Sequence, residues 1–387
     1  MAVTAGHRVG RLERRERLRP DIFLLVSFLV LSALGILMVY TATAPRLIAQ
    51  GEAGDVVMRK QVVFVIIGTV VFLVSSLVDT RKLRAATPLI YLVSLASLIL
   101  VLTPLGDVRA GAQRWIELGA SFQLQPSEPA KVAVILALAA LLARDSDGTL
   151  HWRSVARAIG LVVLPAVLIF RQPDLGTMLV FGFIAVAMLF AAGTSFRQMG
   201  FLVVASIVGT VALFQFKALK VYQLTRLTAF LDQSSSLENA NYNQFQSEVA
   251  IGSGGFLGKG VFNGTQTNLS FVPAQATDFI FTAVGEQLGF IGGALVLGLF
   301  AVIIWRLMLT AVVAHDTFGS FIAVGVASLI AFHVFVNVGM TMSLLPVTGL
   351  PLPFLSNGGT AFVTMSLALG LAHSAWIHRA PLPGERR

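Results

Sequence analysis

A single acidic residue, Asp278, follows a polar stretch and directly precedes a long apolar run that begins at Phe279. A carboxylate at such a place can cap the following helix, and the hydroxyl of Thr277 can do the same. The same carboxylate, beside a glycine-rich segment, could instead act as a general base toward a substrate at a membrane surface. Spacing alone leaves both interpretations open.

A second group of side chains that could take part in chemistry lies near position 120. Glu128 and Lys131 are three residues apart, so a helix would place them on one face, where they can pair. The pair would either let both charges enter an apolar bundle or charge a substrate cavity. Upstream lie Arg109, Arg114 and Trp115. Trp115 is typical of an aromatic belt at a membrane interface, and it could also stack on a sugar face.

A third group surrounds Pro173. Asp174 and Thr177 stand where a helix would begin, which is typical of an N-cap, and Arg171 could face a phosphate. The chain has no cysteine, and its six histidines are not spaced as a metal cluster. Thiolate nucleophiles, disulfides and cysteine-ligated metals are therefore excluded.

These side chains must be positioned by a very apolar scaffold. Hydrophobic residues make up 56% of the 387 residues and charged residues 12%, against roughly 25% charged in soluble domains. This composition excludes a water-soluble enzyme and a disordered chain. The net charge of +9 would suggest nucleic acid in a soluble protein. Here it indicates Lys and Arg held at the cytoplasmic face of a membrane, and we expect no nucleic-acid partner.

The sequence predicts an all-α polytopic membrane protein, because a spanning helix needs about 20 mostly apolar residues. Ten such stretches are present: Ile22–Ala42, Val62–Val78, Pro88–Pro104, Pro129–Ala143, Val155–Phe170, Leu175–Ala192, Gln198–Phe216, Phe279–Trp305, Phe318–Leu345 and Gly358–Ile377. The fourth is short, so we expect its neighbours to bury it inside the bundle.

Lys and Arg placement predicts the orientation. Six arginines lie between Arg8 and Arg19, and further basic residues gather in alternate loops. We therefore expect a basic cytoplasmic N-terminus (1–21), a membrane domain (22–378) and a cytoplasmic tail (379–387). One long extracytoplasmic loop, 217–278, joins spans 7 and 8. Its amphipathic stretches Tyr222–Leu231 and Tyr242–Ile251 could lie along the membrane surface.

Ordered motifs along most of the chain carry a family resemblance. They are Gly111–Trp115, Gln125–Glu128, Gln172–Thr177, Arg226–Asp232, Gln246–Ser247, Ala250–Gly255, Gly258–Gly260, Asn263–Gln266, Thr277–Phe281, Gly285–Glu286, Asn337–Met340, Leu345–Phe354, Ser356 and Gly358–Gly359. With them the sequence resembles the SEDS proteins, the RodA, FtsW and SpoVE group of peptidoglycan polymerases. Within that group, Gly264–Gln266 is more similar to the elongation members (RodA) than to the division members (FtsW).

Two positions depart from the family pattern. The family usually has a histidine where this chain has Ala276, and a tyrosine where it has Asn357. Since the acid of the motif is retained at Asp278, we do not interpret the chain as an inactive homologue. Any role that this histidine or this tyrosine has in other members of the family has no equivalent side chain in this sequence.

The resemblance implies a glycosyltransferase that polymerises lipid II. The 4-hydroxyl of an incoming lipid II would attack the anomeric carbon of the growing strand, and the pyrophosphate-lipid would leave with inversion. Asp278 would be the general base or would orient the acceptor. The negative leaving group requires cations nearby. The candidate cations are Arg109, Arg114, Arg171, Arg226, Lys259 and Lys131 with its partner Glu128. Trp115 and Asp174 are further candidates for binding the substrate. A divalent cation, Mg²⁺ or Mn²⁺, could assist the departure of the pyrophosphate. No set of metal ligands is visible in the sequence. We expect no organic cofactor.

The resemblance also implies partners. The chain contains no Ser-x-x-Lys motif for peptide crosslinking, so we expect a class B penicillin-binding protein to supply it, together with other elongation-complex membrane proteins. The glycines of spans 8 and 9 could form a groove for the single helix of that transpeptidase, although internal packing would use the same glycines. Two rival functions stay open at this point, a lipid II flippase and a non-catalytic scaffold.

Overall fold

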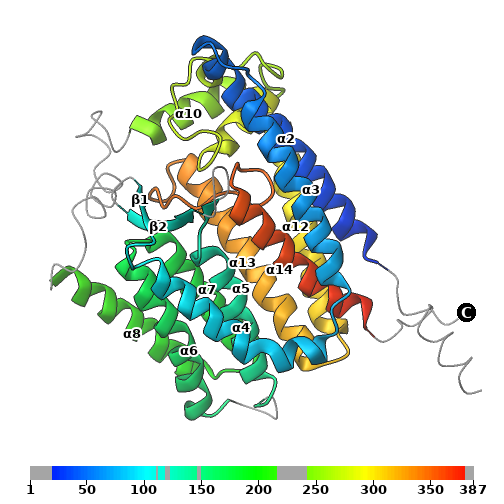
Figure 1. The fold of residues 1–387 in the computed structure, drawn as a ribbon, viewed down its shortest axis with the longest axis vertical. Helices are drawn as coiled ribbons and strands as arrows, with labels where there is room; N and C mark the ends of the chain where they lie inside the picture. Colours follow the sequence, from blue (N-terminus) through cyan, green and yellow to red (C-terminus); the bar gives the residue numbers. More distant parts are fainter. Residues whose placement is uncertain (1–19, 110–111, 118–122, 146–149, 216–241, 380–387) are drawn as a thin grey trace, which may run out of the picture.

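The computed structural model describes residues 20–109, 112–117, 123–145, 150–215 and 242–379. Ten long helices lie within these residues (Figure 1). They are α2 (Ile22–Ala49), α3 (Val56–Ser76), α4 (Thr80–Leu100), α5 (Ser127–Leu142), α6 (Trp152–Arg171), α7 (Leu175–Ala191), α8 (Phe196–Gln215), α12 (Ile280–Val313), α13 (Thr317–Thr341) and α14 (Gly359–Ile377). Each overlaps one predicted span, and the predicted helical, polytopic fold class is confirmed.

Seven of these helices are long and apolar enough to cross a membrane: α2, α3, α4, α6, α12, α13 and α14. Shorter apolar helices cover Leu175–Ala191 and Phe196–Ala212. The count of ten spans therefore stays a prediction. The backbone N–H of Asp21, ahead of α2, donates to His373 Nε2 near the end of α14 at 3.0 Å. Helix α2 thus begins where α14 ends, in agreement with the prediction that both ends of the membrane domain lie on one side.

Some predicted boundaries are wrong, for local reasons. Helix α4 begins at Thr80 rather than Pro88, because Asp79 caps it by accepting from the Arg81 N–H at 2.8 Å. Helix α12 continues past Trp305 to Val313. It can do so because the charge of Arg306 is paired with Asp21 at 2.6 Å.

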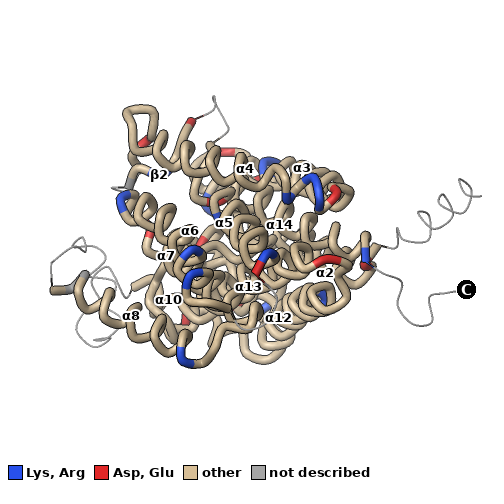
Figure 2. The backbone as a smooth tube through the Cα atoms, turned by 90° about the horizontal axis from the view of Figure 1, so that it is seen from below, with Lys and Arg blue, Asp and Glu red and all other residues tan. Residues whose placement is uncertain are grey.

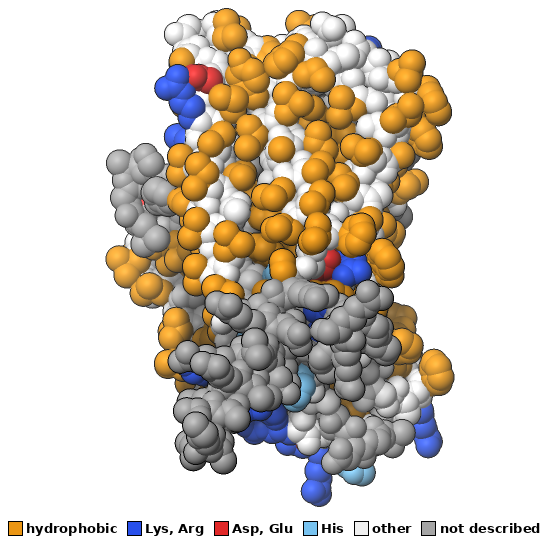
Figure 3. Space-filling view, turned by 90° about the vertical axis from the view of Figure 1, so that its right-hand side faces the viewer, with side chains coloured by type: hydrophobic (Ala, Val, Ile, Leu, Met, Phe, Trp, Pro, Cys, Tyr) orange, Lys and Arg blue, Asp and Glu red, His pale blue; other side chains and the backbone are white. Residues whose placement is uncertain are grey.

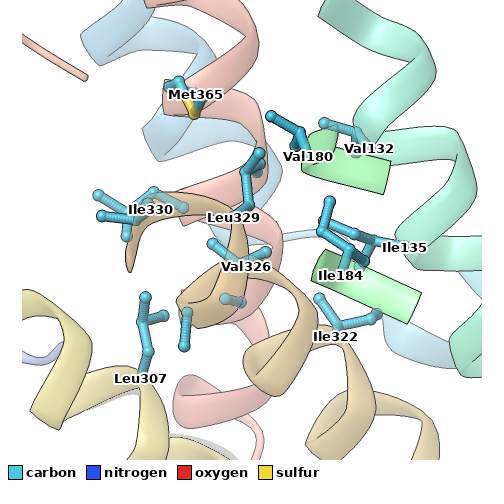
Figure 4. Packing of buried hydrophobic residues seen from close by; sticks show 14 of the residues in the cluster. Val132, Ile135, Val180, Ile184, Leu307, Ile322, Val326, Leu329, Ile330 and Met365 are labelled. Carbon is cyan, nitrogen blue, oxygen red and sulfur yellow. The ribbon is translucent and has the colours of Figure 1, made fainter. Parts of the chain in front are cut away.

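Helix α13 forms the centre of the bundle, and most of its side chains are buried. Figure 4 shows Val326 and Leu329 of this helix facing Ile135 of α5 and Ile184 of α7. Helix α5 is buried along nearly its whole length, as predicted for the short fourth span. A Cβ on Gly325 would collide with Ile135, so glycine is what permits the close approach of α13 and α5.

Charged residues occupy few positions along the chain, and most of the tube in Figure 2 is uncharged. On the side shown in Figure 3, hydrophobic side chains cover the surface between the charged groups. Large apolar side chains such as Val63, Ile66 and Val70 on α3 are exposed. Such a surface is suited to lipid rather than to water.

The segment between α4 and α5 contains strands, which the prediction of an all-α protein did not include. It forms a small antiparallel sheet in the order β1-β2-β3, made of β1 (Asp107–Arg109), β2 (Ala112–Glu117) and β3 (Gln123–Leu124). The Gln113 side chain fixes the sheet to the end of α4 by donating to Thr103 O at 2.7 Å. Strands this short give no alternation that a sequence pattern could reveal.

The long loop between α8 and α12 is described only in its second half. The predicted stretch Tyr242–Ile251 is helical, as part of α10 (Tyr242–Gly254), and a short helix, α11 (Thr265–Asn268), follows it. The other predicted stretch, Tyr222–Leu231, and the candidate residue Arg226 lie outside the described residues.

Candidate active site

Asp278 lies in the turn just before α12 and is half-buried. Its backbone N–H donates to Ala274 O at 3.0 Å, and its carbonyl accepts from Asn337 Nδ2 at 2.8 Å. The N-cap residue of α12 is Phe279, and the Thr277 hydroxyl donates to Ala274 O. Neither of the predicted capping residues therefore occupies the cap position.

The carboxylate of Asp278 faces the segment that follows α13. A Cβ on Gly349 would lie 3.5 Å from Asp278 Oδ2, and Gly349 has a φ of +76° that favours glycine. Asn337 Nδ2 donates to Leu350 O at 2.8 Å as well as to Asp278 O. One carboxamide therefore holds the Asp278 turn and the Thr348–Pro351 segment against each other.

The predicted pairing of Glu128 and Lys131 is present in the structure. Lys131 Nζ lies 2.7 Å from Glu128 Oε1, and both side chains are buried. A third group, missed in the sequence, completes the cluster: His333 Nε2 lies 3.2 Å from Lys131 Nζ. A lysine ammonium can only donate, so this nitrogen accepts and His333 Nδ1 carries the hydrogen. Nδ1 then donates to Pro351 O at 3.0 Å.

Arg114 fixes β2 to the turn between α6 and α7. Its Nε donates to Gln172 O at 2.9 Å, its Nη2 donates to Pro173 O, and its Nη1 lies 3.8 Å from Asp174 Oδ2. Asp174 caps α7 by accepting from the Thr177 N–H at 3.2 Å, as the sequence predicted.

This capped end of α7 also abuts the Thr348–Pro351 segment. A Cβ on Gly176 would lie 2.9 Å from Thr348 O. Three clusters that are far apart in the sequence thus meet around one segment: the Asp278 turn, the Glu128–Lys131–His333 group and the Arg114–Asp174 group. We call this segment, with those three clusters, the convergence site.

The remaining candidate residues have different settings. Arg171 is exposed at the end of α6, and Trp115 is partly exposed in β2 opposite Asp107. Arg109 pairs with Ala112 through the β1–β2 backbone. Lys259 belongs to a separate cluster, where its Nζ lies 3.3 Å from Glu286 Oε1. Among the described residues, no group of three or more His, Asp or Glu could hold a metal ion.

Comparison with known proteins identifies the family. The profile of the family described as "Cell cycle protein" (FTSW_RODA_SPOVE) matches residues 21–380. The chain belongs to this family.

The relatives include a "Probable peptidoglycan glycosyltransferase FtsW" of Trichlorobacter lovleyi, 36% identical over 94% of this chain and 96% of the relative. "Stage V sporulation protein E" of Bacillus subtilis is 36% identical over 91% and 95%. "Peptidoglycan glycosyltransferase MrdB" of Escherichia coli is 35% identical over 84% and 87%.

Solved structures agree with this assignment. The chain superimposes with a TM-score of 0.75 and 28% identity on a chain from "Structural coordination of polymerization and crosslinking by a peptidoglycan synthase complex", covering 93% of this chain and 98% of that one. It superimposes with a TM-score of 0.69 and 27% identity on the Thermus thermophilus rod shape determining protein RodA, covering 94% and 99%.

The two positions that depart from the family's usual pattern are in contact. The backbone N–H of Asn357 donates to Ala276 O at 2.8 Å, which ties the Asp278 turn to the residues ahead of α14. This contact uses backbone atoms alone, so it does not depend on which side chain stands at position 276. His333, which the sequence did not single out, and Asn337, which appeared there only within a family motif, share a face of α13 at a spacing of four. A lone histidine or asparagine in an apolar span gives no indication of its partners.

Proposed function

We propose that this chain polymerises lipid II into the glycan strands of peptidoglycan, with Asp278 at the reacting centre. The enzyme class, peptidoglycan glycosyltransferase, is confirmed by the names of relatives that the chain matches over nearly their whole length. The observation that carries the proposal further is the convergence site, where a half-buried carboxylate is held from its backbone side and its Oδ2 faces Gly349.

In the proposed reaction the 4-hydroxyl of one lipid II attacks the anomeric carbon of the growing strand. Asp278 accepts the hydroxyl proton, a new C–O bond forms, and the bond to the pyrophosphate-lipid breaks with inversion. Lys131 is engaged by Glu128 and His333, so its role is to position neighbouring groups rather than to bind substrate. The exposed Arg171 is better placed to face the pyrophosphate.

The cationic candidates Arg109 and Arg226 remain proposals for the same task. Lys259 remains one as well, with Glu286 and Thr265 holding its ammonium in place. A divalent cation would fit the donor set only together with substrate, because Mg²⁺ is commonly held by one or two carboxylates plus phosphate oxygens. Asp278 would be its protein ligand, and the metal would supply charge for the departing pyrophosphate.

We further propose an elongation role, on the sequence of Gly264–Gln266, in the plasma membrane with the convergence site on the extracytoplasmic side. A division role is the alternative, because relatives carrying FtsW and MrdB names are almost equally similar to the chain. Complementation of strains depleted separately of the elongation or the division polymerase tests this. Rescue of division alone would contradict the elongation role.

We propose a class B penicillin-binding protein as partner, and other elongation-complex membrane proteins beside it. Of spans 8 and 9, α13 is mostly buried, and its Gly319, Gly325 and Gly339 meet internal neighbours, which agrees with internal packing. On α12, a Cβ added at Gly298 would meet no atom within 4 Å, so this glycine lies on an open face. Gly298→Leu should reduce co-purification with the transpeptidase, whereas Gly160→Leu, equally open on α6, should not.

A strand-formation assay in detergent, with a transport assay in vesicles beside it, distinguishes the polymerase from a flippase or a scaffold. Purified protein in detergent is given labelled lipid II, and the products are separated by strand length. A ladder of glycan strands supports the proposal. Protein that moves lipid II across vesicles yet forms no strands would support the flippase. Protein that does neither, alone or with its transpeptidase, would be a scaffold.

A further inference from the structure

Helix α12 is interrupted near its N-terminal end, and a neighbouring loop supplies the backbone hydrogen bonds that the helix lacks there. Gly289 has non-helical angles, φ 65° and ψ −161°. Beyond it, the N–H groups of Phe290 and Ile291 donate to Gly255 O at 3.0 Å and to Phe256 O at 3.2 Å. The backbone groups freed by the break are thus satisfied by the loop that follows α10.

Two further hydrogen bonds run in the opposite direction, from N–H groups of the loop to carbonyls of α12. Lys259 N–H donates to Glu286 O, and Gly260 N–H donates to Gln287 O, both at 3.0 Å. A Cβ on Gly258 would collide with Gln287 O, so only glycine permits this approach. Irregular backbone at membrane depth is tolerated only where its polar groups are satisfied in this way. The arrangement makes residues 255–262 part of the span surface, rather than a loop above it.

Two helices give the depth of this loop. The Asp21–Arg306 ion pair, with Trp305 and Trp376 rings near Arg306, marks one polar boundary of the bundle. Phe290 lies sixteen residues along α12 from Arg306, roughly 24 Å at the rise of a helix. The hydrocarbon core is about 30 Å thick. The Phe290 ring therefore lies inside the far leaflet.

The second helix agrees with the first. On α2, Thr41 lies twenty residues from Asp21, roughly 30 Å along the helix. Thr41 accepts from Gln287 Nε2 at 3.0 Å, three residues before Phe290, which places Gln287 at the far boundary. The ring of Phe262 contacts Tyr40 at a centroid distance of 5.7 Å, so the end of the loop lies near the same boundary.

The side chains of the loop match this depth. The Phe256 ring stacks on Phe290 at 5.6 Å, and both are largely exposed. Leu257 is 76% exposed. On the preceding helix α10, the polar Gln244 and Ser247 are buried, while Phe245 is exposed beside the exposed Glu248.

We propose that residues 255–262 form a re-entrant loop inserted into the membrane leaflet on the α10 side, with Phe256 and Leu257 in contact with lipid acyl chains. The occupant of this apolar surface is lipid, because the loop continues the lipid-facing row of α12 at the same depth. Lys259 then lies at the leaflet boundary, where Glu286 neutralises its ammonium and the Thr265 hydroxyl accepts a hydrogen bond from it. This inference is independent of the reaction proposed above.

The absence of cysteine from the sequence allows a direct test in the full-length protein. Leu257→Cys carries a nitroxide label in nanodiscs, and collision of the label with oxygen is compared with collision with a water-soluble nickel chelate. Ile291→Cys on α12 is the lipid-depth reference, and Glu52→Cys, exposed in the turn between α2 and α3, is the water reference. Monodisperse gel filtration verifies that each labelled protein is folded.

We expect the label at Leu257 to favour collision with oxygen and to be protected from nickel, with a depth parameter closer to that of the Ile291 label than to that of the Glu52 label. A label on Phe256→Cys repeats the measurement at a second exposed position. If either label collides with nickel as readily as the Glu52 label does, the loop lies in water and the inference is overturned.

Discussion

Asn337 holds Asp278 from the backbone side, since its Nδ2 donates to the Asp278 carbonyl at 2.8 Å while also donating to Leu350 O at 2.8 Å. The carboxylate of Asp278 faces Gly349. A single side chain of α13 thus sets the distance between the proposed base and the segment opposite it.

Asn337→Leu should lower both activity and stability. The variant removes the Asn337 donor from two carbonyls, and each carbonyl left unpaired in a buried site costs about 1–3 kcal/mol. The expected result is a lower unfolding temperature in detergent and at least a tenfold drop in polymer formation. Ser206→Ala, which removes an exposed hydroxyl bond within α8, is the control and should change neither. Full activity of Asn337→Leu would show that Asp278 is positioned by other groups.

Glu128 and Lys131 should be energetically coupled. Removal of one partner leaves a buried charge, which costs about 3–5 kcal/mol, whereas removal of both can be nearly neutral. We expect Glu128→Gln and Lys131→Met each to destabilise the protein sharply and the double variant to recover much of the loss. Thermal unfolding of the four proteins measures the coupling. Additive effects would mean that the two charges act independently.

His333 makes two separable contacts, and two substitutions separate them. An asparagine side chain at this position can retain a donor near the place of Nδ1, and a glutamine side chain can retain an acceptor near that of Nε2. If His333 acts on the site through Pro351, His333→Asn should keep more activity than His333→Gln at equal folded fraction. The ratio of kcat to KM for the two variants is the readout. The opposite ranking would mean that His333 acts on the site through its contact with Lys131.

Arg114→Lys should lower both stability and activity, although the positive charge is kept. The guanidinium bonds two backbone carbonyls and lies near Asp174, and an ammonium cannot reproduce that planar geometry. We expect a lower unfolding temperature and lower polymer yield. Arg153→Lys is the matched control, since Arg153 is exposed near the start of α6, and neither its stability nor its polymer yield should change. Equal behaviour of the two variants would remove Arg114 from the site.

Sequence reasoning found the elements whose signals are local. Span length and apolarity located the ten long helices, the three-residue spacing of Glu128 and Lys131 predicted their pairing, and the position of Asp174 after Pro173 predicted its cap. The capping alternative for Thr277 and Asp278 was equally local, and the cap position is occupied by Phe279 instead.

What sequence reasoning missed depends on contacts between distant residues. His333 and Lys131 are 202 residues apart, and Asn337 and Asp278 are 59 apart. The break at Gly289 is marked by one glycine among many in an apolar run, and its repair comes from a loop about thirty residues earlier. Such pairings appear only once the helices are packed, because nothing in the local period encodes them.

The central claim is that the Asp278 carboxylate performs chemistry, and Asp278→Asn tests it most directly. The amide keeps the size and the backbone bond to Asn337 but cannot accept the hydroxyl proton. Purified variant and wild type are given labelled lipid II, with Asp55→Asn, at the exposed Asp55–Arg59 pair, as the control substitution. The account predicts an unchanged unfolding temperature and polymer formation reduced by about 10²-fold or more. Strand formation by Asp278→Asn at the rate of the control would contradict it.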